Sequence, residues 1–205
     1  MSDDKLDWIF ATRDERQLAD RYDAWAANYD ADHDGWEWVG PARAVEQLLA
    51  LGDAPTVLDA GCGTGRVGVA LDAAGWDGVL LGADLSAGML GVAADTGHYD
   101  RLVQATLTEL PFDDGSVDAV IATGVFTHGH VGPEAFPEVM RVVRSGGWVV
   151  ITCREEVWTA LEPAATEHEQ AGRWRLHRRT EPRSFHPGKD DQDDLPQSVV
   201  IWQVV

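Results

Sequence analysis

Apolar runs alternate with helical patterns along most of the chain. Tyr22, Trp25, Ala26 and Tyr29 share one face of a helix, which predicts an N-terminal helix broken between Asp30 and Gly35. The pattern then predicts, in chain order, a helix from 36 through 49, a strand at 56–59, a helix at 66–74, a strand at 79–83, a helix at 87–94, a strand near 102–106, a strand at 117–122, a helix at 133–143 and a strand at 148–153. Strands that alternate with helices form a parallel sheet covered by helices.

In the last third of the chain the regular alternation of strands and helices ends. A helix is predicted at 155–170, followed by an alternating stretch at 174–178 and a terminal strand at 198–204. Two strands joined by a polar loop form an antiparallel hairpin at the sheet edge. We therefore expect an α/β fold with a Rossmann-like, mostly parallel seven-stranded sheet, helices on both faces and a C-terminal antiparallel hairpin.

The length of 205 residues suits one α/β domain. We expect lid helices at about 6–51, a ligand-binding core at about 55–153 and a C-terminal helix and hairpin at about 154–205. No apolar stretch is long enough to span a membrane, and the first five residues lack a signal pattern. Cys62 and Cys153 lack C-x-x-C spacing, so we expect neither a metal site nor a disulfide, and a cytoplasmic location.

The composition is strongly acidic, with a formal net charge of -19. Such a charge repels phosphates and therefore argues against a nucleic-acid partner. The acidic residues are spread along the chain, and Lys is scarce relative to Arg. Two explanations remain open: adaptation to high salt, or a GC-rich genome that favours Asp and Arg codons.

The most informative stretch is Val57-Leu58-Asp59-Ala60-Gly61-Cys62-Gly63-Thr64-Gly65-Arg66. An apolar strand is followed by an acid, alternating glycines and a helix start. Glycines permit positive φ and let a ligand approach the backbone, while free N–H groups at the helix start face polar ligand groups. Such a turn binds a nucleoside-containing cofactor at the carboxyl end of a parallel sheet.

The residues around this turn indicate which cofactor it binds. Residues 63–68 also fit the dinucleotide pattern G-x-G-x-x-G, a weak match when it stands alone. The longer pattern Asp59-x-Gly61-x-Gly63-x-Gly65 resembles motif I of class I methyltransferases that use S-adenosylmethionine (AdoMet). A second acid, Asp84, follows the next apolar strand.

Residues 18–153 resemble a small class I methyltransferase of the group typified by the methyltransferase domains numbered 11 and 25. The resemblance rests on Tyr22-Asp23-x-Trp25-Ala26-x-x-Tyr29-Asp30, on the stretch from Leu110 to Val120, and on Arg144-Ser145-Gly146-Gly147 before the fifth strand. Ser145 replaces the usual proline. Thr106 stands where the family often has an acid that binds the adenine amino group, so adenine recognition is expected from backbone groups and from Leu107 and Met89.

The resemblance implies AdoMet as the cofactor and assigns roles to named residues. Asp84 would bind the ribose hydroxyls, although a helix N-cap is the alternative and Ser86 is better placed for it. Tyr29 would reach the methionine carboxylate. The full set of expected cofactor-binding residues is Tyr29, Asp59, Gly61, Gly63, Gly65, Asp84, Leu85, Met89, Thr106, Leu107 and Thr123.

Methyl transfer needs a base only if the nucleophile arrives protonated, since alignment of donor and acceptor supplies most of the catalysis. His128 and His130 are the candidate catalytic residues, or are ordinary loop histidines. Candidate acceptor-binding residues are Tyr22, Trp36, Phe126 and Arg154. The alternatives are core packing for the aromatic residues and surface ion pairing for Arg154.

Three functions remain in competition. A methyltransferase acting on a small-molecule acceptor is favoured, with no nucleic-acid or membrane partner and no prediction of oligomeric state. An NAD-dependent oxidoreductase fits residues 63–68, but no second sheet half remains to complete it. A binding protein that holds AdoMet without catalysis is the third, because methyl transfer has no obligatory catalytic residue.

Overall fold

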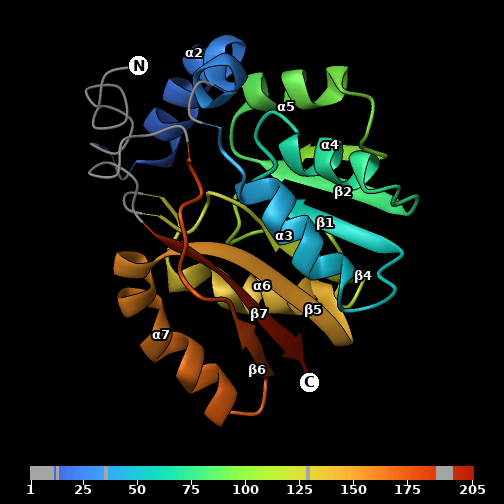
Figure 1. The fold of residues 1–205 in the computed structure, drawn as a ribbon, viewed down its shortest axis with the longest axis vertical. Helices are drawn as coiled ribbons and strands as arrows, with labels where there is room; N and C mark the ends of the chain where they lie inside the picture. Colours follow the sequence, from blue (N-terminus) through green and yellow to red (C-terminus); the bar gives the residue numbers. More distant parts are fainter. Residues whose placement is uncertain (1–11, 13, 35–36, 128–129, 188–195) are drawn as a thin grey trace.

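The computed structural model describes residues 12, 14–34, 37–127, 130–187 and 196–205 (Figure 1). The elements in chain order are α2 (Glu15–Asp34), α3 (Gly40–Leu49), β1 (Thr56–Ala60), α4 (Arg66–Ala73), β2 (Val79–Asp84), α5 (Ala87–Asp95), β3 (Arg101–Gln104), β4 (Val117–Ala122), the short 3-10 helix η1 (Pro133–Ala135), α6 (Phe136–Val142), β5 (Val143–Arg154), α7 (Glu155–Gln170), β6 (Trp174–Arg179) and β7 (Gln197–Val204). The predicted alternation of strands and helices is confirmed.

The strands form one seven-stranded sheet in the order β3-β2-β1-β4-β5-β7-β6. The first five strands pair in parallel, and β7 runs antiparallel to both of its neighbours, β5 and β6. The predicted sheet and its edge hairpin are therefore confirmed. The strand order reverses between β1 and β4, and open α/β sheets bind ligands at the carboxyl ends beside such a reversal.

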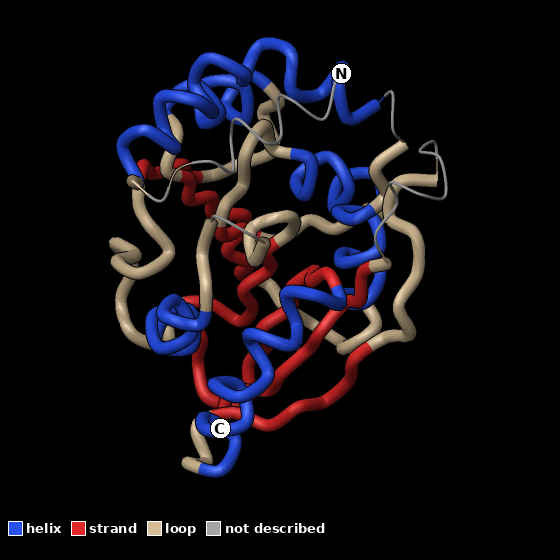
Figure 2. Tube along the Cα trace, turned by 90° about the vertical axis from the view of Figure 1, so that its left-hand side faces the viewer, coloured by secondary structure: helices blue, strands red, loops and turns tan. Residues whose placement is uncertain are grey.

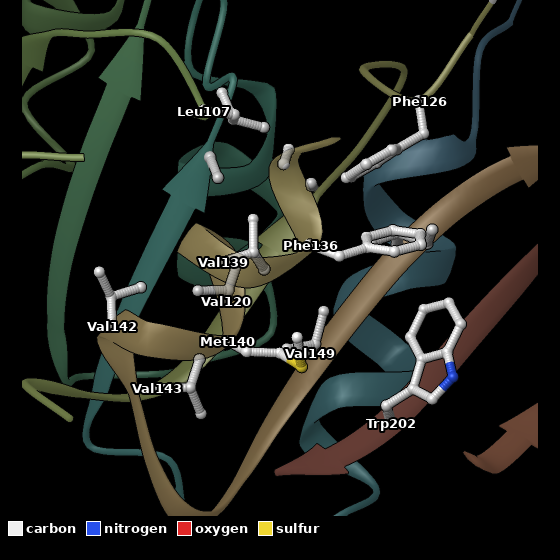
Figure 3. Close-up of a cluster of buried hydrophobic side chains, with 14 of the residues drawn as sticks. Leu107, Val120, Phe126, Phe136, Val139, Met140, Val142, Val143, Val149 and Trp202 are labelled. Atoms are coloured by element: carbon white, nitrogen blue, oxygen red, sulfur yellow. The ribbon is translucent and has the colours of Figure 1, made fainter. Parts of the chain in front are cut away.

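Helices cover both faces of the sheet with apolar side chains. α3 and α4 pack on one face, where Leu48 and Leu71 meet the strands. α6 and α7 pack on the other face. In Figure 3, Phe136 of α6 lies between Phe126 and Trp202, with ring centroids 5.6 and 6.1 Å away. Because helices pack on both faces, the strands and the residues at their carboxyl ends are held in place.

The helix α2 lies at one end of the long axis of the molecule, and the C-terminus lies toward the other end, in both Figure 1 and Figure 2. It packs against α5. Its side chains Tyr22 and Tyr29 reach a cavity that is also lined by residues from the carboxyl ends of the strands. No helix within the described ranges is long and apolar enough to cross a membrane.

The largest differences from the prediction are at three element boundaries. The helix α2 continues to Asp34 instead of breaking at Asp30, because both carboxylates pair with Arg66 and stabilise its last turns. α3 begins at Gly40 instead of position 36, since Glu37 has a φ of 54° that no helix continues. β5 begins at Val143, where pairing with Val117 extends the strand.

Candidate functional site

The turn from β1 to α4 has the backbone geometry that its glycines predict. Gly61 and Gly63 have φ values of 79° and 52°, in the left-handed region that favours glycine. A Cβ on Gly61 would lie 2.3 Å from a methyl group of Val125, so any side chain is excluded there. A Cβ on Gly63 would meet nothing within 4 Å, because this residue faces a cavity.

Asp84 ends β2 beside this turn. Its carboxylate accepts hydrogen bonds from the backbone N–H of Gly63 at 2.8 Å and of Ser86 at 2.9 Å. Burial raises the pKa of Asp84, although these backbone donors oppose the rise. Ser86 is the N-cap of α5, where its hydroxyl accepts from the N–H of Met89 at 3.0 Å. Asp84 is therefore held at the cavity wall, and Ser86 is the N-cap of this helix.

A cavity of about 510 Å³ opens at the carboxyl ends of the strands, under α2. It brings together most of the residues predicted to bind the cofactor, namely Tyr29, Gly61, Gly63, Asp84, Leu85, Met89, Thr106, Leu107 and Thr123. Tyr22 and His130, predicted on the acceptor side, also line it. Segments far apart in the sequence thus form one compartment.

Asp59 and Gly65, which were also predicted to bind the cofactor, are not on the wall of this cavity. Asp59 is fully buried and accepts a hydrogen bond from the hydroxyl of Tyr99 at 2.7 Å. Its other carboxylate oxygen has no hydrogen-bond partner among the described residues. Burial raises the pKa of Asp59 to about 7, although the hydrogen bond from Tyr99 acts to lower that pKa. The structure therefore places this acid in the interior, bonded to Tyr99, and not on the cavity wall.

The aromatic stripe of α2 packs within the fold and also lines the cavity. Trp25 is 2% exposed and packs edge-on against Tyr29, with ring centroids 4.7 Å apart. Tyr22 and Tyr29 line the cavity. Burial raises the pKa of both phenols, so they are neutral at ordinary pH. The helix is at once a packed element and a cover over the cavity.

Two carboxylates attach α2 to the N-termini of α4 and α5. Asp23 accepts from the Ser86 hydroxyl at 2.5 Å and from the Gly88 N–H at 2.8 Å, at the start of α5. Asp30 accepts from the Thr64 hydroxyl at 2.7 Å and from Nε of Arg66 at 2.8 Å, at the start of α4. Negative charge is stabilised at helix N-termini, so both contacts hold the cover in place.

The predicted acceptor residues divide between two compartments. The Tyr22 hydroxyl and Nε2 of His130 lie 2.6 Å apart at the main cavity. Phe126 and Arg154 instead line a second, smaller cavity of about 70 Å³ that shares Tyr22, Tyr29 and His130 with the first. His128 and Trp36 lie outside the described residues.

Several residues that line these cavities were missed by the sequence reasoning. The main cavity has an apolar wall made by Leu18, Val131, Pro133, Val157, Ala160 and Leu161, and acidic residues Glu15 and Glu134 also line it. The smaller cavity adds His33, Thr152, His186 and Gln197. Helical periodicity could have marked Leu18, which precedes Tyr22 by four positions. The other residues carry no local signal, because only the tertiary fold brings them here.

Comparison with known proteins agrees with this geometry. A family model described as a methyltransferase domain matches residues 58–151. Methyltransferase-like protein 27 of Homo sapiens is 38% identical over 164 residues, which cover 75% of this chain and 66% of the human protein. The curated relatives are longer, and the aligned parts cover between 42% and 66% of their lengths.

Solved structures share the fold. A methyltransferase of Haloferax volcanii, solved in complex with the Trm112 methyltransferase activator, matches with a TM-score of 0.68 at 20% identity, over 89% of this chain and 97% of that chain. Geranyl diphosphate C-methyltransferase of Streptomyces coelicolor, solved with S-adenosyl-L-homocysteine, matches with a TM-score of 0.59 at 17% identity, over 80% and 79%. The expected Rossmann-like fold is confirmed.

Proposed function

The chain belongs to the methyltransferase-domain family through its residues 58–151, and on this premise we propose that it transfers a methyl group from AdoMet to a small-molecule acceptor. One observation carries the proposal. The glycine turn, the Asp84 carboxylate and Tyr29 converge on one cavity at the point where the strand order reverses. This is where open α/β sheets bind nucleoside cofactors.

In this proposal the cofactor extends along the cavity. Asp84 binds the ribose hydroxyls, since a carboxylate accepts from two neighbouring hydroxyls. The adenine packs against Leu85, Met89 and Leu107, with Thr106 beside it. The methionine part lies along Gly61 and Gly63, close to Tyr29. Each of these residues lines the cavity.

The charge of the cavity supports a cationic ligand. Its described lining includes Glu15, Asp84 and Glu134 but neither Lys nor Arg. AdoMet carries a positive sulfonium, whereas its product S-adenosylhomocysteine carries a neutral sulfur. An acidic compartment therefore favours the methyl donor over the spent product.

The acceptor side offers a proton-transfer pair. Tyr22 faces the cavity and lies at hydrogen-bond distance from Nε2 of His130. When the nucleophile carries a proton, the Tyr22 oxygen takes that proton as the phenol proton passes to His130. Because Tyr22 is never left as a phenolate, its raised pKa is compatible with this role. Alignment of the methyl group with the nucleophile supplies the rest.

The net charge of -19 supports a small molecule over a nucleic acid as the acceptor. The two buried cysteines support a reducing, cytoplasmic setting. An NAD-dependent oxidoreductase is disfavoured by the family match. A protein that holds AdoMet without catalysis is the remaining alternative, and turnover separates it from the enzyme.

Calorimetry on the purified protein tests the proposal. We expect AdoMet to bind with micromolar affinity, about -8 kcal/mol, and NAD not to bind. Asp84→Asn keeps a side-chain oxygen for the Gly63 N–H but removes the charge, and should weaken AdoMet binding at least about tenfold. The matched control is Asp95→Asn, an exposed acid at the end of α5.

Binding of NAD in place of AdoMet, or equal AdoMet affinity in the two variants, would contradict this assignment. Turnover is then followed as release of S-adenosylhomocysteine in the presence of a panel of metabolites. Tight AdoMet binding with no release for any compound would favour the non-catalytic alternative.

A further inference from the structure

The smaller cavity differs in charge from the cofactor cavity beside it. Its volume is about 70 Å³, and it lies where β5 ends and β7 begins. Its described lining contains Arg154 but neither Asp nor Glu, in a chain that has 35 acidic residues. The two compartments therefore suit ligands of opposite charge, a cation in the larger and an anion in the smaller.

Two hydrogen-bond donors converge on this smaller cavity. Arg154 and Gln197 are directly opposite each other in the antiparallel pairing of β5 with β7, and both line the cavity. Side chains of opposed residues stand on the same face of a sheet. The pairing register thus places a guanidinium and a carboxamide side by side.

The side chain of Gln197 lacks an internal partner. The residue is 6% exposed, and its backbone N–H and C=O are both bonded to Arg183. Its side-chain amide has no hydrogen bond to any other described residue. The neighbouring Thr152 hydroxyl, in contrast, already accepts from the Gly124 N–H at 2.9 Å. The Gln197 amide is not among the fully buried side-chain groups without a partner, so it is open to the cavity that it lines and can bond to a ligand there.

Arg154 brings the N–H groups of its guanidinium to the same cavity. Its guanidinium forms an ion pair with the carboxylate of Glu156 at 3.7 Å, which is longer than a hydrogen bond, so a ligand carboxylate would compete with Glu156 for the charge of Arg154. A guanidinium has five N–H groups in a planar fork that matches the two oxygens of a carboxylate. The Arg154 side chain is 25% exposed, so most of any contact with it is shielded from water.

We propose that this cavity binds a carboxylate group of the methyl acceptor, with Arg154 and Gln197 as its hydrogen-bond donors. The inference rests on the proposed function, since it names the class of molecule that the methyltransferase uses. The volume of the smaller cavity is about that of two water molecules. It therefore admits a carboxylate group but leaves the rest of the acceptor outside.

The carboxylate is an anchor, and another group on the same molecule is methylated. Hydrogen bonds from Arg154 and Gln197 would occupy the oxygen lone pairs that a nucleophile needs. The cavity also shares Tyr22 and His130 with the cofactor cavity, so the rest of an anchored molecule lies beside the proton-transfer pair. The acceptor class is therefore a compact hydroxy or amino carboxylic acid.

Binding of matched acids and amides to the protein saturated with S-adenosylhomocysteine tests the proposal. The probes are hydroxybenzoates and short 2-hydroxy acids, each paired with its primary amide. Titrations by NMR should show that acids bind at least about tenfold more tightly than their amides. Arg154→Met and Gln197→Met should each remove most of this preference, and Arg154→Lys should recover part of it because it keeps the charge without the fork.

Arg175→Met, at an exposed position on β6, is the matched control and should bind the acids like the original protein. Amides that bind as well as acids, absence of acid binding, or full acid binding in Arg154→Met would overturn the proposal. AdoMet affinity is measured on the same samples. If the unmutated protein binds AdoMet but binds acids no more tightly than their amides, this inference alone is rejected. If the unmutated protein does not bind AdoMet, the proposed function is rejected.

Discussion

The buried acid of the glycine motif makes stability depend on pH in a specific direction. Asp59 is fully buried at the end of β1, and burial raises its pKa from an ordinary 3.8 to about 7. Between these values the folded protein keeps a proton that the unfolded chain has lost. The contribution of Asp59 to stability is therefore complete below about pH 4 and is lost as the pH rises to about 7.

The size of the effect follows from the two pKa values. A difference of about three pH units corresponds to about 4 kcal/mol at its full extent, or about 1.4 kcal/mol per pH unit. Asp59→Asn removes the titration and keeps an oxygen that can accept from Tyr99. Relative to this variant, the unmutated protein should lose stability steadily from pH 5 to pH 7 and then level off.

The assay is urea unfolding at several pH values for both proteins, with the exposed Asp95→Asn as control. Carboxylates that do not interact with Asp59 affect the two proteins equally, so the difference in free energy of unfolding reports Asp59 together with its electrostatic coupling to Asp84. The control should follow the unmutated protein at every pH. Parallel curves for Asp59→Asn and the unmutated protein would contradict this prediction, because they would mean that Asp59 titrates alike in the folded and unfolded states.

Three further predictions concern the turn, the cover and the acidic surface. Gly63→Val should weaken AdoMet binding at least about tenfold in calorimetry, since its side chain enters the cavity. Gly52→Val is the control, because Gly52 also has a positive φ but does not line the cavity, and equal affinities of the two variants would contradict this prediction. Asp30→Asn should speed AdoMet dissociation about threefold to fivefold, because it loosens the attachment of α2 to Arg66. Stopped-flow fluorescence measures this rate, and an unchanged rate would mean that α2 does not control the release of AdoMet. If the acidity is an adaptation to salt, the thermal midpoint should rise between about 0.1 M and about 2 M KCl, whereas equal midpoints favour the genome-composition explanation.

The features that could be predicted from the sequence are those set by local rules. The strand, glycine turn and helix around Gly63 follow from backbone freedom and apolar periodicity within a few residues. The position of Asp84 on the cavity wall could be predicted in the same way, because this residue ends the next strand of a parallel sheet. Parallel strands place their carboxyl ends at one edge, so the cofactor wall follows from the element order.

The features that could not be predicted depend on pairs of residues distant in sequence. The support of Asp59 comes from Tyr99, forty positions later, through a contact that no local pattern specifies. Gln197 faces Arg154 only because of the β5–β7 register, and one residue of slippage would turn its side chain to the other face. The sequence therefore predicted the cofactor side more fully than the acceptor side.

A crystal structure of the protein with S-adenosylhomocysteine would show directly whether the cavity under α2 is the cofactor site. We expect the ligand in this cavity, with its ribose hydroxyls at hydrogen-bond distance from Asp84 and its amino-acid part along Gly61 and Gly63, close to Tyr29. A ligand bound elsewhere, or one whose ribose makes no contact with Asp84, would contradict it.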